Sequence, residues 1–198
     1  MVLQVIYVRD DDVLLKRMAH TDAAGEFVNV HNIIEKYGYT HCPALLTNDL
    51  NEFPEVIEFI RYKTQQGKMI PQLHGSSHID YAKLSVKEIQ DDYNRCQDWF
   101  LANIGVRFDK HYTPWGAGGR RKDGSPMVNG THIAPTASAM DITVVDMYKP
   151  LDPRHILADA NVSWTKYNER TITIHWWFSP EILDQALAKL KEAENGTP

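Results

Sequence analysis

The chain of 198 residues has no long apolar run, no large excess of one charge and only two cysteines. No apolar run approaches the roughly 20 residues that a helix needs to cross a bilayer, so we expect no membrane partner. The formal net charge of −5 gives no reason to expect a polyanionic ligand, and we predict that nucleic acid is not a partner. Cys42 and Cys96 lack metal-site spacing, which favours buried, reduced thiols.

The N-terminal segment lacks the features of a secretory signal. Residues 1–8 carry no basic region and no small-residue cleavage site before Arg9. We therefore interpret this segment as a strand and predict a cytoplasmic protein. Apolar residues at 43% and charged residues at 24% are typical of a globular chain, and the length fits one domain over residues 1–198. No feature of the sequence indicates an oligomeric state.

Strand-like apolar runs alternate with helical patterns, without internal repeats. The expected strands cover residues 3–8, 43–47, 69–73, 110–113, 142–145 and 171–177. The expected helices are residues 27–37, one capped by Asn51, one opened by a capping box at Ser85 and Glu88, and one beginning near Pro180. This alternation predicts an α/β fold with parallel strands and outer helices. In such folds the site forms at the carboxyl ends of the strands.

Two histidines follow the third expected strand, in the stretch His74-Gly75-Ser76-Ser77-His78. We expect residues four apart to share one face of a helical turn. Such a pair can hold one metal ion and leave room for a carboxylate and a water. A pair of surface histidines at a helix start explains the spacing equally well.

Three aspartates in a row, Asp10, Asp11 and Asp12, lie at the expected end of the first strand. Adjacent carboxylates repel one another and are costly to desolvate, and a bound cation would relieve both effects. An acidic loop neutralised by Arg9 is the alternative. Two histidines, one aspartate and an open fourth position suit catalytic zinc or a similar divalent ion.

Taken in order, the motifs resemble those of polysaccharide deacetylases with the NodB homology domain, which form carbohydrate esterase family four. The matching features are the adjacent aspartates, the His-x-x-x-His stretch, Pro114-Trp115-Gly116 and the apolar-x-apolar-His run that ends at His175. The resemblance spans Val8 to about Leu190. It implies a distorted (β/α)7 barrel and metal-dependent hydrolysis of an N-acetyl or O-acetyl group on a sugar.

The resemblance also implies a role for each matching residue. Asp11 is similar to the general base of the family, and Asp12 is similar to its metal-binding aspartate. His74 and His78 are similar to the two histidine ligands of one divalent ion, which we expect to be zinc. His175 is similar to the late histidine that protonates the leaving amine or alcohol.

The third motif, Tyr112 to Gly116, resembles the segment that lines the substrate groove, through Tyr112, Pro114 and Trp115, and whose backbone helps to hold the oxyanion. Trp177 is a further candidate for stacking on a sugar ring, although one tryptophan of an alternating strand is often core. The family usually has an arginine that braces the base where this chain has Tyr112. The fourth family motif has no clear match, and Asp146 is the nearest candidate.

The predicted function is therefore a metal-dependent hydrolase that removes acetyl groups from a carbohydrate or a small acylated substrate. Hydrolysis of a non-sugar amide such as a cyclic ureide is an alternative within the enzymes. A catalytically silent carbohydrate-binding protein that keeps the metal for its structure is the alternative from another class.

Overall fold

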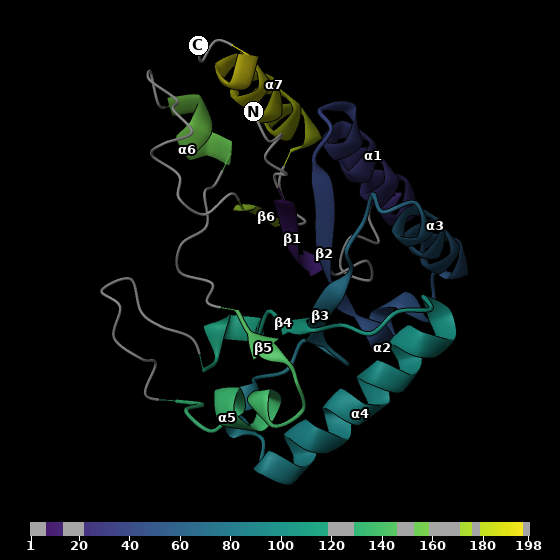
Figure 1. Cartoon of the computed structure of the whole chain (residues 1–198), viewed down its shortest axis with the longest axis vertical. Coiled ribbons are helices and arrows are strands. Elements are labelled where there is room, and N and C mark those ends of the chain that lie inside the picture. Colours follow the sequence, from purple (N-terminus) through teal and green to yellow (C-terminus); the bar gives the residue numbers. More distant parts are fainter. Residues whose placement is uncertain are drawn as a thin grey trace.

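The computed structural model describes residues 7–13, 22–118, 129–145, 153–158, 171–175 and 179–195. Within these ranges, six parallel strands form one sheet in the order β5-β4-β3-β2-β1-β6 (Figure 1). The strands are β1 (Tyr7–Val13), β2 (Thr40–Leu46), β3 (Gln72–Gly75), β4 (Lys110–His111), β5 (Thr143–Val144) and β6 (Thr171–His175). The helices are α1 (Ala23–Lys36), α2 (Thr47–Leu50), α3 (Pro54–Gln65), α4 (Val86–Asn103), α5 (Ile133–Ser138), α6 (Pro153–Ala158) and α7 (Pro180–Asn195), with the short 3₁₀ helices η2 (Tyr81–Lys83) and η3 (Pro114–Gly116).

The sheet is curled, and helices cover its outer side. Figure 1 shows α7, α1, α3, α4 and α5 following one another around the strands, and each contacts the next. This arrangement confirms the predicted distorted (β/α) barrel of the NodB type. The resemblance implied seven strands, and the described part of the chain contains six.

The core lies between the strands and the outer helices and consists of two clusters. The larger includes Leu45 and Leu73 from the strands, with Ile60 and Phe100 from α3 and α4. The smaller packs β1 and β6 against α1 and α7. Each fully buried aliphatic or aromatic side chain contributes about 1.5–3 kcal/mol, so the two clusters stabilise the packing of the helices on the sheet.

The start of α4 confirms the predicted capping box, because the Ser85 side chain accepts from the Glu88 N–H and Glu88 accepts in return. The predicted cap of α3 is wrong. That helix begins after Phe53, with Pro54 at its first position, where the missing N–H of proline carries no cost. Asn51 instead accepts a hydrogen bond of 2.7 Å from the indole of Trp99.

The first strand continues beyond its predicted end, since β1 (Tyr7–Val13) contains the three aspartates, and residues 3–6 of the prediction lie outside the described residues. Its parallel pairing with β2 is regular from Tyr7 to Asp10 and then shifts before Val13. Both cysteines are buried and free, as predicted. Among the described residues, no helix has the length and apolar character needed to cross a membrane.

Candidate functional site

Several of the predicted site residues lie at or just beyond the carboxyl ends of neighbouring strands. Asp11 of β1 lies in register with His175 of β6, so the proposed base and acid occupy adjacent positions on paired strands. His74 lies near the end of β3, and Tyr112 directly follows β4. The structure describes only the backbone of Asp12 and His175, and Trp177 lies outside the described residues.

The shift in pairing between Asp10 and Val13 falls on the aspartates. In a regular strand, Asp11 and Asp12 would face opposite sides of the sheet. A bulge adds local twist and re-aims side chains, which is how one site can use two consecutive residues. The irregular pairing therefore removes a geometric objection to assigning Asp11 and Asp12 to the same site.

The histidine pair is close together, but the predicted helical turn is wrong. His74 belongs to β3, and residues 76–78 form a bend. Gly75 allows the reversal with a φ of 128°, and a Cβ there would lie only 2.9 Å from the Ser77 carbonyl oxygen. The ring centroids of His74 and His78 are 5.2 Å apart, so the bend brings the two side chains together without a helical turn.

His74 is fully buried and its Nδ1 lies 2.5 Å from the carbonyl oxygen of Tyr112. Because a carbonyl can only accept, Nδ1 carries a proton, and in the neutral ring the lone pair is then on Nε2. Metal-binding histidines are held by this kind of outer contact, which fixes the tautomer and the ring orientation. The environment of His74 therefore fits a metal ligand.

The complete ligand set stays a prediction. Among the residues whose side chains the structure describes, no group of three or more His, Cys, Asp or Glu is arranged to hold a metal ion. The predicted set depends on Asp12, whose side chain is not described. The donor chemistry of His74 and His78, two imidazole nitrogens, suits zinc or a similar divalent ion.

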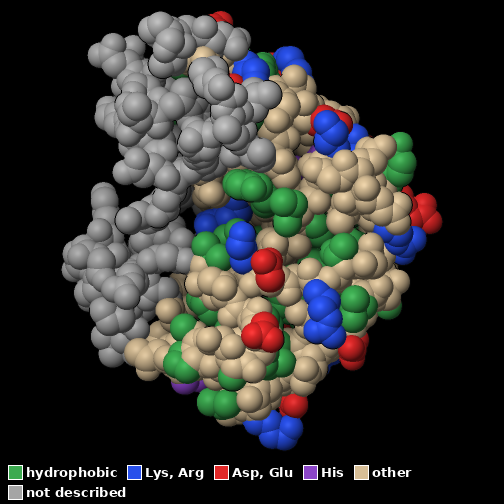
Figure 2. All heavy atoms as spheres, viewed as in Figure 1, with side chains coloured by type: hydrophobic (Ala, Val, Ile, Leu, Met, Phe, Trp, Pro, Cys, Tyr) green, Lys and Arg blue, Asp and Glu red, His purple; other side chains and the backbone are tan. Residues whose placement is uncertain are grey.

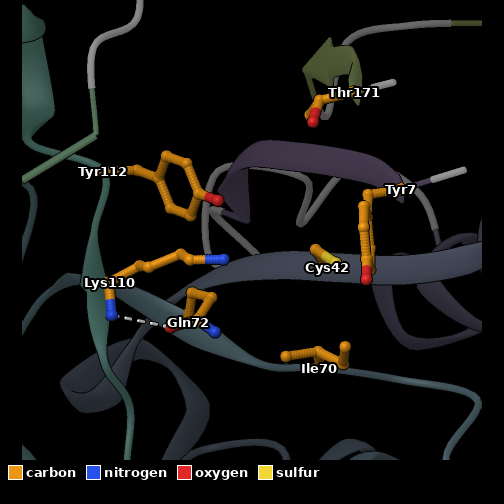
Figure 3. A pocket seen from close by; sticks show the side chains of 7 residues that line it. All are labelled: Tyr7, Cys42, Ile70, Gln72, Lys110, Tyr112 and Thr171. Carbon is orange, nitrogen blue, oxygen red and sulfur yellow. Dashed lines mark hydrogen bonds between the residues drawn. The ribbon is translucent and has the colours of Figure 1, made fainter. Parts of the chain in front are cut away.

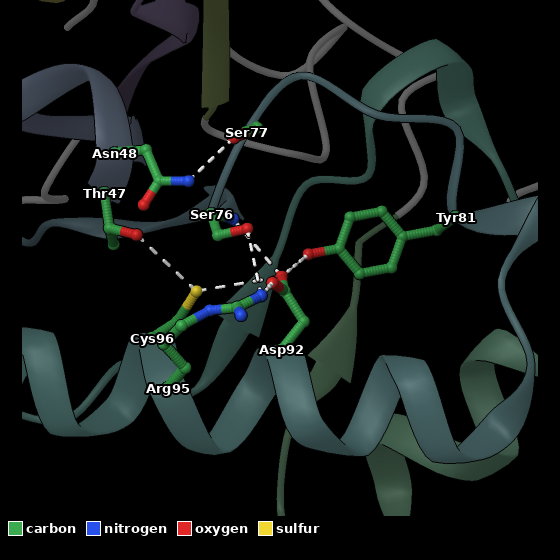
Figure 4. Close-up of polar contacts among 8 residues, drawn as sticks. All are labelled: Thr47, Asn48, Ser76, Ser77, Tyr81, Asp92, Arg95 and Cys96. Atoms are coloured by element: carbon green, nitrogen blue, oxygen red, sulfur yellow. Dashed lines mark hydrogen bonds and ion pairs between the residues drawn. The ribbon is translucent and has the colours of Figure 1, made fainter.

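A buried carboxylate that sequence reasoning missed supports the bend (Figure 4). Asp92 of α4 is 2% exposed and accepts hydrogen bonds from the Ser76 N–H at 3.2 Å, from the Tyr81 hydroxyl and from Arg95. Burial alone would raise the pKa of Asp92, but these hydrogen bonds outweigh it and hold the pKa below its usual value. The ionised carboxylate thus ties both ends of the segment that follows His74 to α4.

A signal for Asp92 is present in the sequence. The residue lies three positions after Ile89 and four before Cys96, on the apolar face of α4. A charged residue on a buried helix face needs partners, because an unpaired buried charge is costly. The stripe alone does not identify the partners of Asp92, because Ser76 and Tyr81 lie in a separate segment that precedes α4.

The third motif forms a tight turn beside the histidines. Trp115 has a φ of 61°, an uncommon conformation for a bulky residue, and 65% of its surface is exposed. Its ring lies edge-on to His78 with centroids 4.9 Å apart, and Pro114 beside it is buried. An exposed aromatic held in a strained turn next to His78 is well placed to contact a substrate.

Tyr112 is buried, in contrast to Trp115, and only 6% of its surface is exposed. Its ring stacks on the guanidinium of Arg9, 4.4 Å from the ring centroid. Arg9 in turn donates from Nη2 to Oδ2 of Asp11 at 2.5 Å, with both side chains buried. Arg9 therefore pairs with the predicted base, and Tyr112 packs against that pair.

A small cavity of about 100 Å³ lies on the other side of Tyr112 (Figure 3). Four of the lining residues are the first residues of their strands, namely Tyr7, Gln72, Lys110 and Thr171. The other three are Cys42, Ile70 and Tyr112. The Tyr112 hydroxyl and the Lys110 amino group point into it (Figure 3). The cavity is therefore at the amino ends of the strands, opposite the histidine pair.

No protein-family model and no curated protein matches the chain. Among solved structures, it is similar to a family 4 carbohydrate esterase from Streptomyces lividans, with a TM-score of 0.63 and 16% identity, covering 97% of this chain and 88% of that one. It is also similar to the peptidoglycan deacetylase PdaC from Bacillus subtilis, with a TM-score of 0.62 and 18% identity over 96% and 84% of the two chains. A family pseudoenzyme from Bacillus anthracis matches with a TM-score of 0.61 and 13% identity over 97% and 62%. The chain therefore has the NodB-type fold of the family 4 carbohydrate esterases and polysaccharide deacetylases.

Proposed function

We propose that the protein is a metal-dependent hydrolase that removes acetyl groups from a carbohydrate. The observation that carries this proposal is the histidine pair, with His74 fixed by the Tyr112 carbonyl at the strand ends of this fold. Several proteins with similar structures are described as peptidoglycan deacetylases or as a carbohydrate esterase. The fold and the pair point to the same chemistry.

Asp12, His74 and His78 would hold one divalent ion, with zinc the best match to two imidazoles and a carboxylate. Such an ion, when bound, polarises the acyl carbonyl and lowers the pKa of water. The ion bound by these three residues would place the acyl group at the strand ends, between Asp11 and Trp115.

The remaining steps belong to side chains and backbone of this chain. Asp11 would take the proton of the attacking water at a carboxylate oxygen, and His175 would give a proton to the leaving nitrogen or oxygen. Backbone groups at the Trp115 turn would hold the oxyanion, and the exposed Trp115 ring would pack on the sugar. The register of Asp11 with His175 supports these roles for base and acid, because the attacking water and the leaving group both bond to the acyl carbon.

The charge pattern of one face bears on a nucleic acid partner. On the face seen in Figure 2, Lys and Arg side chains are interspersed with Asp and Glu over the described surface. A face of this kind has no extended cationic track for a nucleic acid backbone.

A catalytically silent protein is the second candidate, because one structurally similar protein is described as a pseudoenzyme of family four. The lack of a clear match to the fourth motif also favours it, since that element tunes the acid histidine in the family, and the candidate Asp146 lies outside the described residues. In this case the histidine pair would serve structure alone.

Acetate release separates the two candidates. Protein reloaded with zinc would be incubated with N-acetylated chitooligosaccharides and O-acetylated xylooligosaccharides, and free acetate measured by NMR. We expect release by the wild type, loss in His78→Ala, and full retention in His132→Ala. His132 is the matched control, because its Nε2 bonds the Leu84 carbonyl away from the strand ends. A zinc-loaded wild type that releases no acetate from either substrate would favour the silent protein.

A further inference from the structure

Arg9 and Asp11 form a buried ion pair on a single strand. Residues two apart on a strand face the same side, so both side chains lie on the face of β1 that carries Tyr7. The Arg9 side chain is 4% exposed and the Asp11 side chain 0%, and their Nη2 and Oδ2 atoms are 2.5 Å apart. Each charge would be costly to bury alone, so each depends on the other.

The pairing leaves the two oxygens of Asp11 in different environments. Oδ2 accepts from Arg9, whereas Oδ1 has no hydrogen-bond partner among the described residues. A carboxylate with one oxygen tied has a fixed plane, and its second oxygen is available to accept a proton. This is the arrangement that a general base needs.

Tyr112 fixes Arg9 in turn. Its ring covers the guanidinium at 4.4 Å, and the Tyr112 carbonyl receives the His74 Nδ1 proton. One residue therefore supports both the partner of Asp11 and a proposed metal ligand. Stacking on an aromatic face suits arginine and not lysine, whose compact ammonium has no plane to stack.

We propose that Arg9, stacked on Tyr112, is the positioning residue for Asp11 and occupies the role of the arginine that the third motif lacks. This inference rests on the proposed hydrolase function. The guanidinium reaches Asp11 from its own strand, and the tyrosine at the position of the missing arginine supports it. A salt bridge that only neutralises a buried acid is the competing explanation.

The cavity at the amino ends of the strands makes this proposal testable by chemical rescue. Tyr7 lines the cavity, and Arg9 follows on the same face of β1, so Arg9 lies between the cavity and Asp11. In Arg9→Ala the lost side chain would extend the cavity of about 100 Å³ towards Asp11. Methylguanidinium is small enough to enter such a space, and its planar group can replace the guanidinium of Arg9.

The kinetic test compares Arg9→Met, Arg9→Lys and Arg61→Met on whichever acetylated oligosaccharide the wild type hydrolyses. A misplaced catalytic group costs up to about a hundredfold, so kcat of Arg9→Met should fall about ten- to a hundredfold while KM changes less than about twofold. Arg9→Lys should recover only part of the loss. Arg61 is the matched control, because it is a part-buried arginine that bonds the Asn103 carbonyl outside the site, and Arg61→Met should keep the wild-type kcat.

Rescue supplies a readout that a structural role would not give. Millimolar methylguanidinium should raise kcat of Arg9→Ala at least several-fold and leave Asp11→Asn unchanged. Equal kcat values for Arg9→Met and Arg61→Met, or an Arg9→Ala variant that does not respond, would overturn the positioning role.

Thermal melting of the metal-free protein tests the pairing without any substrate. Arg9→Met and Asp11→Asn should each lower Tm, and the double variant should melt higher than the sum of the two losses predicts. Additive losses would overturn the pairing. A wild type that hydrolyses nothing would overturn the proposed function, whereas the melting cycle would still decide whether Arg9 holds Asp11.

Discussion

The most informative single substitution outside the site is Asp92→Asn, which keeps the shape of the side chain and removes its charge. Asp92 accepts from the Ser76 N–H, the Tyr81 hydroxyl and Arg95 (Figure 4). The Arg95 side chain is 64% exposed, so solvent screens its share. Both buried donors bond the same oxygen, Oδ2, so an asparagine oxygen at that place still accepts from them but carries no negative charge. The asparagine NH₂ then faces Arg95, from which it cannot accept.

A hydrogen bond to a charged group contributes about 1.5–3 kcal/mol and one to a neutral group about 0.5–1.5 kcal/mol, so weakening two bonds should lower the free energy of unfolding by about 2–3 kcal/mol. For a chain of this size that corresponds to a loss of roughly 4–12 °C in Tm. The bend that follows His74 would also loosen. Changes to groups that orient metal ligands cost about ten- to a hundredfold in metal affinity, and we expect a zinc affinity loss in that range.

The neighbouring residue supplies the control. Asp91 pairs with Lys87 at 2.8 Å on the exposed side of α4, with 58% of its side chain exposed. Asp91→Asn should therefore change stability by less than about 0.5 kcal/mol and leave zinc affinity unchanged. Thermal denaturation and zinc titration of both variants give the answer. Equal melting temperatures for the two would refute the idea that Asp92 anchors the bend.

Three further predictions concern acid stability and the site. Burial, with smaller effects from His41 and Lys63, lowers the pKa of His31 to about 4, so the unfolded chain binds a proton between pH 6.5 and 4 that the folded chain does not. The free energy of unfolding should therefore decrease as the pH is lowered, by about 1 kcal/mol from pH 6.5 to 5.5 for this group. In urea titrations, His31→Leu should lose less stability over the same pH range than the wild type. Asp11→Asn should keep its zinc and lose most turnover, whereas Asp12→Asn should lose zinc first; elemental analysis showing the reverse would shift the assignment by one residue. His175→Ala should lower turnover roughly a hundredfold with zinc content unchanged, and should affect amides more than activated esters.

The sequence predicted correctly those features of the fold that depend on a single short segment. The capping box at Ser85 and Glu88 and the apolar stripe of α4 depend only on nearby residues, and both are confirmed. The alternation of strands and helices predicted the parallel sheet, because parallel strands need crossover connections. The clustering of strand ends then followed from topology.

Contacts between distant segments were outside the reach of these patterns. The contact of His74 with the Tyr112 carbonyl depends on how β3 meets β4, and the stacking of Arg9 on Tyr112 depends on the curl of the sheet. Spacing suggested a helical turn for the histidine pair, but the fully buried end of β3 and the left-handed Gly75 give a bend instead. Propensity is a weak prior, and tertiary packing overrode it here.

An anomalous difference map of crystals grown from chelator-free, zinc-supplemented protein shows directly whether Asp12, His74 and His78 bind a zinc ion. We expect one peak, strong above the zinc edge and weak below it. It should lie about 2.0–2.2 Å from a ring nitrogen of His74, a ring nitrogen of His78 and a carboxylate oxygen of Asp12. A map without a peak between the two histidines, or with the ion bound away from Asp12, would contradict it.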